Sequence, residues 1–134
     1  MLTAATALFA VALGAPLADE RRAVGLSYGE ALGRAEKYEA DAASNDYRLK
    51  ALYPALTPRM PALFSTCYPD TVRRPVQFTM VLSFKGGRFD RVEVNSDDPV
   101  ARCIVRIFEG YSYPKPPHDD FAEEIHLDLK PRGD

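Results

Sequence analysis

The sequence predicts an α+β fold, in which a three-stranded antiparallel sheet with strand order 2-1-3 is packed by helices. Three segments alternate apolar and polar residues, at 76–84, 88–95 and 124–129, which is the period of a β-strand. Elsewhere apolar residues recur every three or four positions, as in helices. The chain has 134 residues, 46% hydrophobic and 27% charged, so its size and composition are those of one globular domain.

The most apolar of the three strands is expected at 76–84, where large apolar residues alternate at positions 78, 80, 82 and 84. This richness favours a central strand. A tight turn at residues 85–87, Lys-Gly-Gly, would connect it to the strand at 88–95 in a β-hairpin. The third strand, at 124–129, would direct three apolar side chains inward, those of Ile125, Leu127 and Leu129.

Three helices are expected before the hairpin. The first begins at Tyr28, with Ser27 as its N-cap, and two shorter helices cover 47–56 and 58–67. The 58–67 helix starts with proline and would direct Cys67 inward.

A fourth helix follows the hairpin. Asp98 and Pro99 are typical of an N-cap and a first helical position, and Gly110 marks the end. Its apolar stripe includes Cys103, which we expect to face the sheet. Because this helix carries the chain back across the sheet, the third strand should lie beside the first, on an edge.

The first eighteen residues differ from the rest of the chain. Residues 1–18 contain no charge and hold a short apolar run followed by small residues, which is the order of a secretory signal peptide. An uncleaved membrane anchor is the alternative, but the run is too short and broken for a stable membrane span. We expect a polar linker at 19–27, a single domain at 28–134, and a periplasmic or secreted protein.

Export changes the interpretation of the two cysteines, Cys67 and Cys103. Two cysteines in an oxidising compartment are usually paired, so we expect a disulfide between them. A buried free thiol and a catalytic thiol are the other readings of the same residues.

Composition and motifs argue against several kinds of site. The net charge of −2 provides no basic stripe for nucleic acid and no attraction to an anionic membrane. His118, followed by two aspartates, is interpreted as part of a solvated loop rather than a metal site, and His126 as a surface histidine. We therefore expect no enzyme activity, no catalytic residue, no metal and no cofactor.

Several motifs occur together in residues 58–131: Cys67-Tyr68 at the end of a helix, a hairpin with a glycine turn, and the stretch from Asp98 to Cys103. A proline-rich exit at 113–117 and the closing Leu-Asp-Leu-Lys-Pro at 127–131 complete the set. With these motifs, residues 58–131 resemble the C-terminal domains of the TonB/TolA family, including the AgmX/PglI-type domains.

The resemblance implies a module that works by protein–protein contact in the bacterial envelope. Partners of such domains add a strand to a sheet edge, and an unpaired edge offers the backbone groups for this. The partner, an envelope protein or an extended peptide segment, would then dock on Ile125, His126, Leu127 and Asp128.

Two other functions stay open at this point. One is a secreted small enzyme or ligand carrier with an unrecognised site, which would need a pocket lined by convergent polar groups. The other is a small inhibitory or structural envelope protein, which differs from the interaction module only in its partner. The sequence leaves the oligomeric state undetermined.

Overall fold

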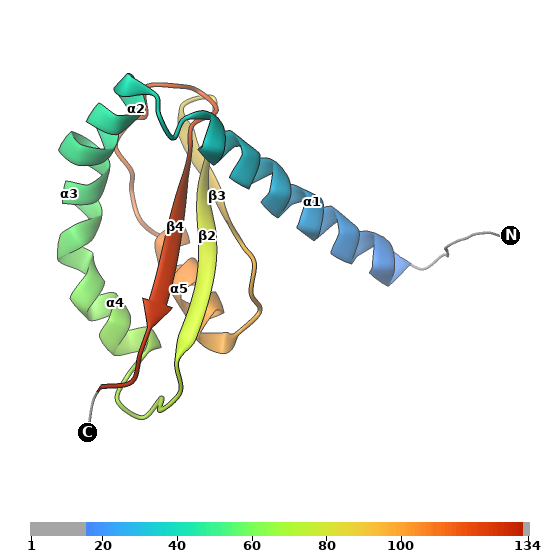
Figure 1. Cartoon of the computed structure of the whole chain (residues 1–134), viewed down its shortest axis with the longest axis vertical. Helices are drawn as coiled ribbons and strands as arrows, with labels where there is room; N and C mark the ends of the chain where they lie inside the picture. The colour runs from blue at the N-terminus through green and yellow to red at the C-terminus, as the bar shows by residue number, and fades with distance from the viewer. Residues whose placement is uncertain (1–15, 133–134) are drawn as a thin grey trace, which may run out of the picture. The chain divides into compact units, whose positions relative to one another are not determined.

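The computed structural model describes residues 16–132 (Figure 1). Residues up to 30 and residues from 31 onward are two compact units, and the account below concerns the second. None of the described helices is both long and apolar enough to cross a membrane. The elements follow one another as α1 (Pro16–Lys37), α2 (Ala42–Tyr47), η1 (Arg48–Leu52), α3 (Tyr53–Leu56), η2 (Thr57–Arg59), α4 (Met60–Cys67), β2 (Val76–Lys85), β3 (Arg88–Val94), α5 (Pro99–Glu109) and β4 (Ala122–Leu129).

The sheet has β2 at its centre, antiparallel to both neighbours, in the order β3-β2-β4. This confirms the predicted α+β class and the strand order 2-1-3. The pairing of β2 with β4 runs without a break from Val76 opposite Leu129 to Ser83 opposite Ala122. The pairing of β2 with β3 is interrupted by a bulge after Ser83.

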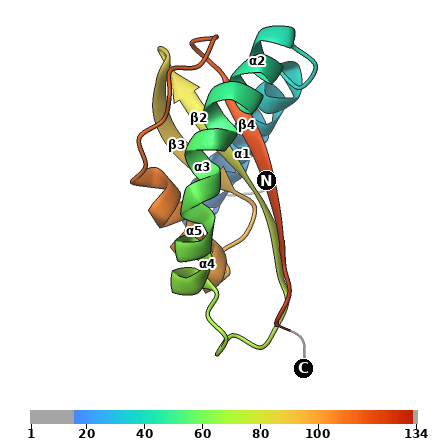
Figure 2. The same cartoon turned by 90° about the vertical axis from the view of Figure 1, so that its left-hand side faces the viewer.

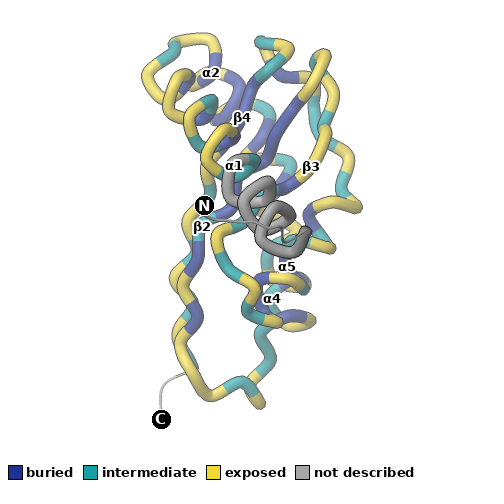
Figure 3. The backbone as a smooth tube through the Cα atoms, turned by 90° about the vertical axis from the view of Figure 1, so that its right-hand side faces the viewer, coloured by how far each residue is buried: buried dark blue, intermediate teal, exposed yellow. Residues whose placement is uncertain are grey.

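The main core lies between one face of the sheet and a helical layer (Figure 2). The layer consists of α5 and of the consecutive helical segments from α2 to α4, residues 42–67, which we call the helical run. Alternate residues of β2 point into this core, and Figure 3 shows long buried stretches in the strands. The largest fully buried side chains of the core are Phe84, Phe108, Phe121, Leu52, Leu63, Met80, Leu82 and Ile104.

The opposite face of the sheet is also partly covered. Val81 and Ser83 point away from the main core by strand alternation, yet both are buried. Ala31 and Ala35, four residues apart on the last turns of α1, are buried as well and lie outside the main cluster. Small side chains on a helix allow its backbone to approach a neighbouring surface closely, so these alanines explain how a short helical end shields this face.

The β2–β3 hairpin turns on two glycines, as expected. Gly86 and Gly87 have φ angles of 61° and 76°, which lie in the left-handed region that side chains with a Cβ rarely adopt. The N–H of Gly87 donates to the carbonyl of Asp119 at 3.1 Å. The turn therefore holds the segment that enters β4.

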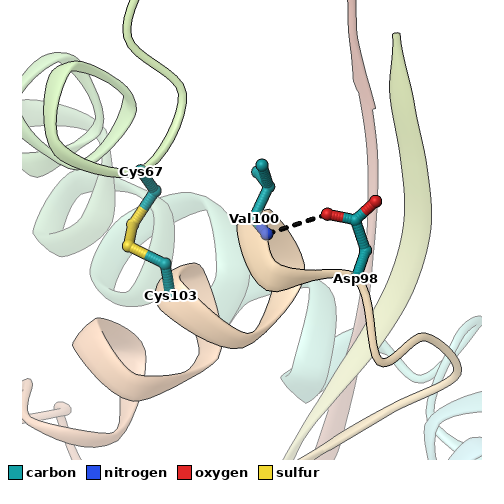
Figure 4. Close-up of a disulfide and its surroundings, with 4 residues drawn as sticks. All are labelled: Cys67, Asp98, Val100 and Cys103. Atoms are coloured by element: carbon teal, nitrogen blue, oxygen red, sulfur yellow. Dashed lines mark hydrogen bonds between the residues drawn. A yellow bond between two sulfur atoms is a disulfide. The ribbon is translucent and has the colours of Figure 1, made fainter. Parts of the chain in front are cut away.

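Helix α5 begins as the sequence predicts. Asp98 is the N-cap, and its Oδ1 accepts from the N–H of Val100 at 2.8 Å (Figure 4). Both carboxylate oxygens of Asp98 also accept from the guanidinium of Arg74, at 2.6 and 3.0 Å. The Arg74 contact is the main reason why the pKa of Asp98 is lowered.

The expected start of the first helix is wrong. Helix α1 begins at Pro16, not at Tyr28, so the segment 19–27, expected as a polar linker, is helical and Ser27 lies inside the helix. Helix α1 as a whole is rich in alanine, leucine, glutamate and arginine, which are strong helix formers, and its one proline, Pro16, stands at the first helical position. The expected signal peptide at 1–18 falls largely outside the described residues and stays a prediction.

The two short helices expected at 47–56 and 58–67 also need correction, because the helical run is almost continuous from 42 to 67. Pro54, Pro58 and Pro61 each stand in the first positions of a new segment. The run accommodates them by changing helix type, through a π turn at η1 and a 3₁₀ turn at η2.

The expected disulfide is present and joins the two helices of the core layer (Figure 4). Cys67 ends α4 and Cys103 lies in α5, with their Cα atoms 5.5 Å apart. Cys67 is buried, whereas Cys103 is half-buried and faces α4 instead of the sheet, which corrects the orientation expected from its stripe. Val100, Ile104 and Phe108 are the residues of α5 that cover the sheet side.

Loss of this disulfide is expected to lower the free energy of unfolding by about 4 kcal/mol, since the bond closes a loop with a sequence separation of 36. Urea unfolding of the oxidised protein and of the Cys67→Ala/Cys103→Ala variant measures the difference. Addition of reductant should destabilise the wild type alone. Equal stabilities of the two proteins would contradict the structural role.

Candidate functional site

β4 is an edge strand, and the alternation of its hydrogen bonds determines which backbone groups are available. The N–H of Phe84 donates to the carbonyl of Phe121 at 2.9 Å, so these residues form a hydrogen-bonded pair. Such pairs alternate with non-bonded pairs along an antiparallel ladder, and residues 123, 125, 127 and 129 therefore turn their backbone groups toward β2. Four residues turn theirs outward, namely Ala122, Glu124, His126 and Asp128, and the last three of these are exposed.

These outward groups form no backbone hydrogen bond with another described residue. The strand contains no proline, and its pairing with β2 continues without a bulge over eight residue pairs. Proline and bulges interrupt the backbone groups of a sheet edge, whereas charged side chains, which β4 carries at Glu124 and Asp128, leave those groups in place. The outer side of β4 is therefore a regular template for a further strand.

The opposite edge of the sheet, at β3, is less regular and is partly occupied by a side chain. The carbonyl of Thr79 accepts from the N–H of Asn95 at 3.2 Å, so by the same alternation Val92 turns its backbone outward. The N–H of Val92 donates to Oε2 of Glu109, a side chain of α5, at 3.5 Å. Together with the bulge after Ser83, this contact makes β3 a poor template.

The structure places the four residues expected to bind a partner next to one another on β4, but in two different roles. Ile125 and Leu127 are half-buried, face the helical layer and bond through their backbone to β2. His126 and Asp128 are exposed on the other face and present their backbone groups to the free edge. Glu124 shares this second role, and sequence reasoning missed it because the hydrogen-bond register is invisible in one strand.

The imidazole of His126 is anchored to the central strand. Its Nδ1 lies 2.9 Å from Oγ1 of Thr79, and its Nε2 lies 3.3 Å from Nε2 of Gln77. Both ring nitrogens therefore lie within hydrogen-bond distance of side chains of β2. The side chain thus lies against β2 and leaves the outer edge of His126 clear.

A buried ion pair stands at the start of this edge. Nε of Arg48 contacts Oε1 of Glu123 at 2.5 Å, with side chains 11% and 5% exposed. Arg48 also donates to Oδ1 of Asn45 at 2.8 Å and to the carbonyl of Tyr38 at 3.0 Å. The hydroxyl of Tyr53 donates to Oε2 of Glu123 at 2.5 Å. A buried pair is tolerated when its remaining donors and acceptors are satisfied in this way.

Tyr53 stays a hydrogen-bond donor over the whole physiological range. Burial and its hydrogen bond to Glu123 raise the pKa of Tyr53 to about 12. Glu123 lies opposite Leu82 on the core face, in phase with the inward positions of β4. The alternation of β4 could have revealed this pair from the sequence. Glu123 stands two residues before Ile125 and therefore falls at an inward, buried position, where a carboxylate requires a basic partner.

A first hollow opens beside this pair and reaches the outer edge of β4. Its volume is about 270 Å³, and Glu39, Arg48, Tyr53, Glu123 and Glu124 are among its lining residues. Since Arg48 is already engaged by Glu123, the uncompensated charge here is negative. Beside it stand the two exposed large apolar side chains of the described surface, Leu49 at 70% and Tyr53 at 40% exposure.

A second hollow lies at the other end of β4, with a volume of about 590 Å³. Apolar side chains from α4, the following loop and β4 form part of its lining, namely Phe64, Tyr68, Val72 and Leu129. Charged residues surround them in pairs of opposite sign: Lys130 lies 3.9 Å from Asp128, and Arg132 lies 3.5 Å from Asp70. This end therefore suits an apolar group rather than a charge.

His118 is not simply solvated, as the sequence suggested, but belongs to a polar cluster that holds the segment before β4. Its ring stacks on Tyr38 at 4.5 Å, and its Nε2 lies 2.8 Å from Oδ2 of Asp41. The hydroxyl of Tyr38 donates to Asp120, which also pairs with Lys37 at 3.4 Å. The cluster ties the end of α1 and the cap of α2 to the strand entrance.

Within the described part of the chain, no group of three or more His, Cys, Asp or Glu side chains is arranged to hold a metal ion. Cys67 and Cys103 are bonded to each other, so neither offers a thiolate for nucleophilic chemistry. The arrangement at β4 can donate and accept backbone hydrogen bonds along one line, with a negative end and an apolar end.

Comparisons with known proteins give no match: no protein-family model fits the chain, and neither a curated protein nor a solved structure is significantly similar.

Removal of one member of the buried ion pair is expected to destabilise the domain strongly. Arg48→Met leaves the carboxylate of Glu123 buried without its cation and should lower the free energy of unfolding by about 3–5 kcal/mol. The double variant Arg48→Met/Glu123→Met should recover most of this loss, because no unpaired charge is left. Urea titration measures both, and equal losses in the single and double variants would contradict this account.

The Asp41–His118 contact is expected to shape stability in acid. The hydrogen bond from His118, followed by those from Ser44, lowers the pKa of Asp41 from 3.8 to about 2. A lowered folded-state pKa contributes stability above the unfolded-state value and loses it as pH falls toward 2. Asp41→Asn should therefore flatten the fall of the urea midpoint between about pH 5 and 2.

Asp46→Asn provides a control for this measurement, because Asp46 lies in α2, the helix that Asp41 caps, and its side chain is 60% exposed and pairs with Lys50 on the surface. This substitution should leave the fall of the urea midpoint between about pH 5 and 2 unchanged. If the urea midpoint of Asp41→Asn falls with pH as steeply as that of the wild type, the contact with His118 does not determine stability in acid.

Proposed function

We propose that this domain is an exported protein-interaction module of the envelope, which binds an extended segment of a partner protein by strand addition at β4. The observation that carries the proposal is the outward backbone of Glu124, His126 and Asp128 on a regular edge. The edge at β3 is less regular, because a bulge interrupts it and Glu109 occupies the N–H of Val92.

Further support comes from the surroundings of the edge. The two hollows lie at opposite ends of β4, where side chains of an added strand would project. The buried pair of Arg48 with Glu123 and the Gly87–Asp119 hydrogen bond fix the strand at its start. A template fixed in advance loses little conformational entropy when a partner strand binds.

The resemblance of residues 58–131 to TonB/TolA C-terminal domains agrees with this role, since such domains bind partners through a sheet edge. We assign the chain no enzyme activity in this proposal. The disulfide between Cys67 and Cys103 suits an oxidising compartment such as the periplasm.

The hydrogen-bond register identifies the backbone position that tests strand addition. His126→Pro removes an outward N–H without removing a bond to β2, whereas Ile125→Pro would break the sheet itself. His126→Pro should therefore weaken binding of the partner by about tenfold, because one backbone hydrogen bond is lost and the proline ring projects toward the added strand. Binding is measured by pull-down from a periplasmic extract, followed by titration of the recovered partner.

His126→Ala is the matched control, because it removes the same imidazole but keeps the N–H. It should bind like the wild type, and circular dichroism should show all three proteins folded. Equal partner recovery by His126→Pro and His126→Ala would refute strand addition at β4.

A further inference from the structure

We infer that the segment bound at β4 carries a basic side chain opposite Glu124 and an apolar side chain opposite Leu129, on opposite faces of the added strand. This inference rests on the proposed strand addition and specifies the chemistry of the partner. Its basis is the difference between the two ends of one edge.

The end near Glu124 selects a positive charge. Glu39 and Glu124 line the same hollow, and neither forms an ion pair with another described residue. The one cation of this hollow, Arg48, has its Nε bonded to Glu123 and its other nitrogens bonded to Asn45 and Tyr38. A lysine or arginine of the partner would meet two carboxylates that lack a counter-charge, which is charge complementarity at a binding edge.

The end near Leu129 selects an apolar group. Phe64 of α4, Tyr68 directly after it and Leu129 of β4 are all half-buried around the second hollow, so an apolar side chain placed there would complete their burial. The charges at this end are already matched in the Lys130–Asp128 and Arg132–Asp70 pairs.

The geometry of a strand fixes the spacing of the two side chains. Glu124 and Leu129 are five residues apart, about 17 Å along a strand, and an odd separation places them on opposite faces. Leu129 faces the helical layer with Ile125 and Leu127, whereas Glu124 faces the other side. A partner in register therefore has its basic and apolar residues five positions apart, and a separation of four would direct one of them to the wrong face.

A second copy of the chain fits this edge poorly. Antiparallel pairing of two β4 strands about His126 would place Glu124 of each copy opposite Asp128 of the other. Two such pairs of like charges directly across a strand pair are destabilising. This register therefore disfavours a second copy, and we take the occupant to be a different segment, with positive charge where β4 is negative.

The test uses synthetic octapeptides with blocked ends, threonine at all other positions, and the intact disulfide-bonded protein. One peptide has lysine second and leucine seventh, and another has the reverse order, because the added strand can run in either direction. Two matched peptides move leucine by one position, to a separation of four. Affinities come from NMR titrations that follow the backbone amides of Glu124, His126 and Asp128.

Of the two peptides with lysine and leucine five positions apart, one should bind about tenfold more tightly than its counterpart with a separation of four. The counterpart loses either the burial of its leucine or the contact of its lysine. Replacement of its lysine by glutamine should weaken binding by about two- to fivefold. The Glu39→Gln/Glu124→Gln variant should abolish that lysine preference, while the leucine preference persists.

The outcomes separate the two proposals. If peptides of both spacings bind equally and His126→Pro still weakens them relative to His126→Ala, strand addition holds and the inferred register is wrong. If no peptide shifts the β4 amides, or if His126→Pro has no effect, both are wrong. Shifts of the same amides with rising protein concentration and no peptide would indicate a second copy as the occupant, which also overturns the inference.

Discussion

The hydrogen-bond parity of β2 is the constraint on which the rest of the structure depends. As the central strand, β2 bonds through its even-numbered residues to β4 and through its odd-numbered residues to β3. This division determines that Val92 on one edge and Glu124, His126 and Asp128 on the other turn their backbone outward. Whether each edge is open is then decided by its neighbours. Among the described residues, only β3 has an outward N–H, that of Val92, which donates to a side chain, that of Glu109.

A second requirement is that β4 stay in one position while its outer side is unpaired. Its start is held by polar contacts with three separate parts of the chain: the hairpin turn, the end of α1 and the helical run. These are the Gly87–Asp119 hydrogen bond, the Tyr38–Asp120 hydrogen bond and the buried Arg48–Glu123 pair. A buried ion pair contributes little net stability, but it allows only one geometry, so its value here is in fixing the strand rather than in strengthening the core.

Local sequence signals predicted much of this fold because each has a local physical cause. The glycine turn, the N-cap at Asp98 and the alternation of β2 depend on residues a few positions apart, and all three are present in the structure. The first helix was placed wrongly because the capping pattern at Ser27 competes with strong helix formers before it, and the latter prevail. The helical run was divided wrongly because prolines can begin a new type of helical turn without ending the helix.

The sequence by itself determined the fold class, the strand order, the pairing of Cys67 with Cys103, and the strand on which the candidate edge lies. Only the tertiary structure decided which residues of that strand are available. A strand pattern shows which face a side chain occupies, but the direction of an N–H depends on the neighbour to which it bonds. For the same reason the partners of Glu123 and Glu109 could not be read from the chain, since Arg48 lies 75 positions away from the former.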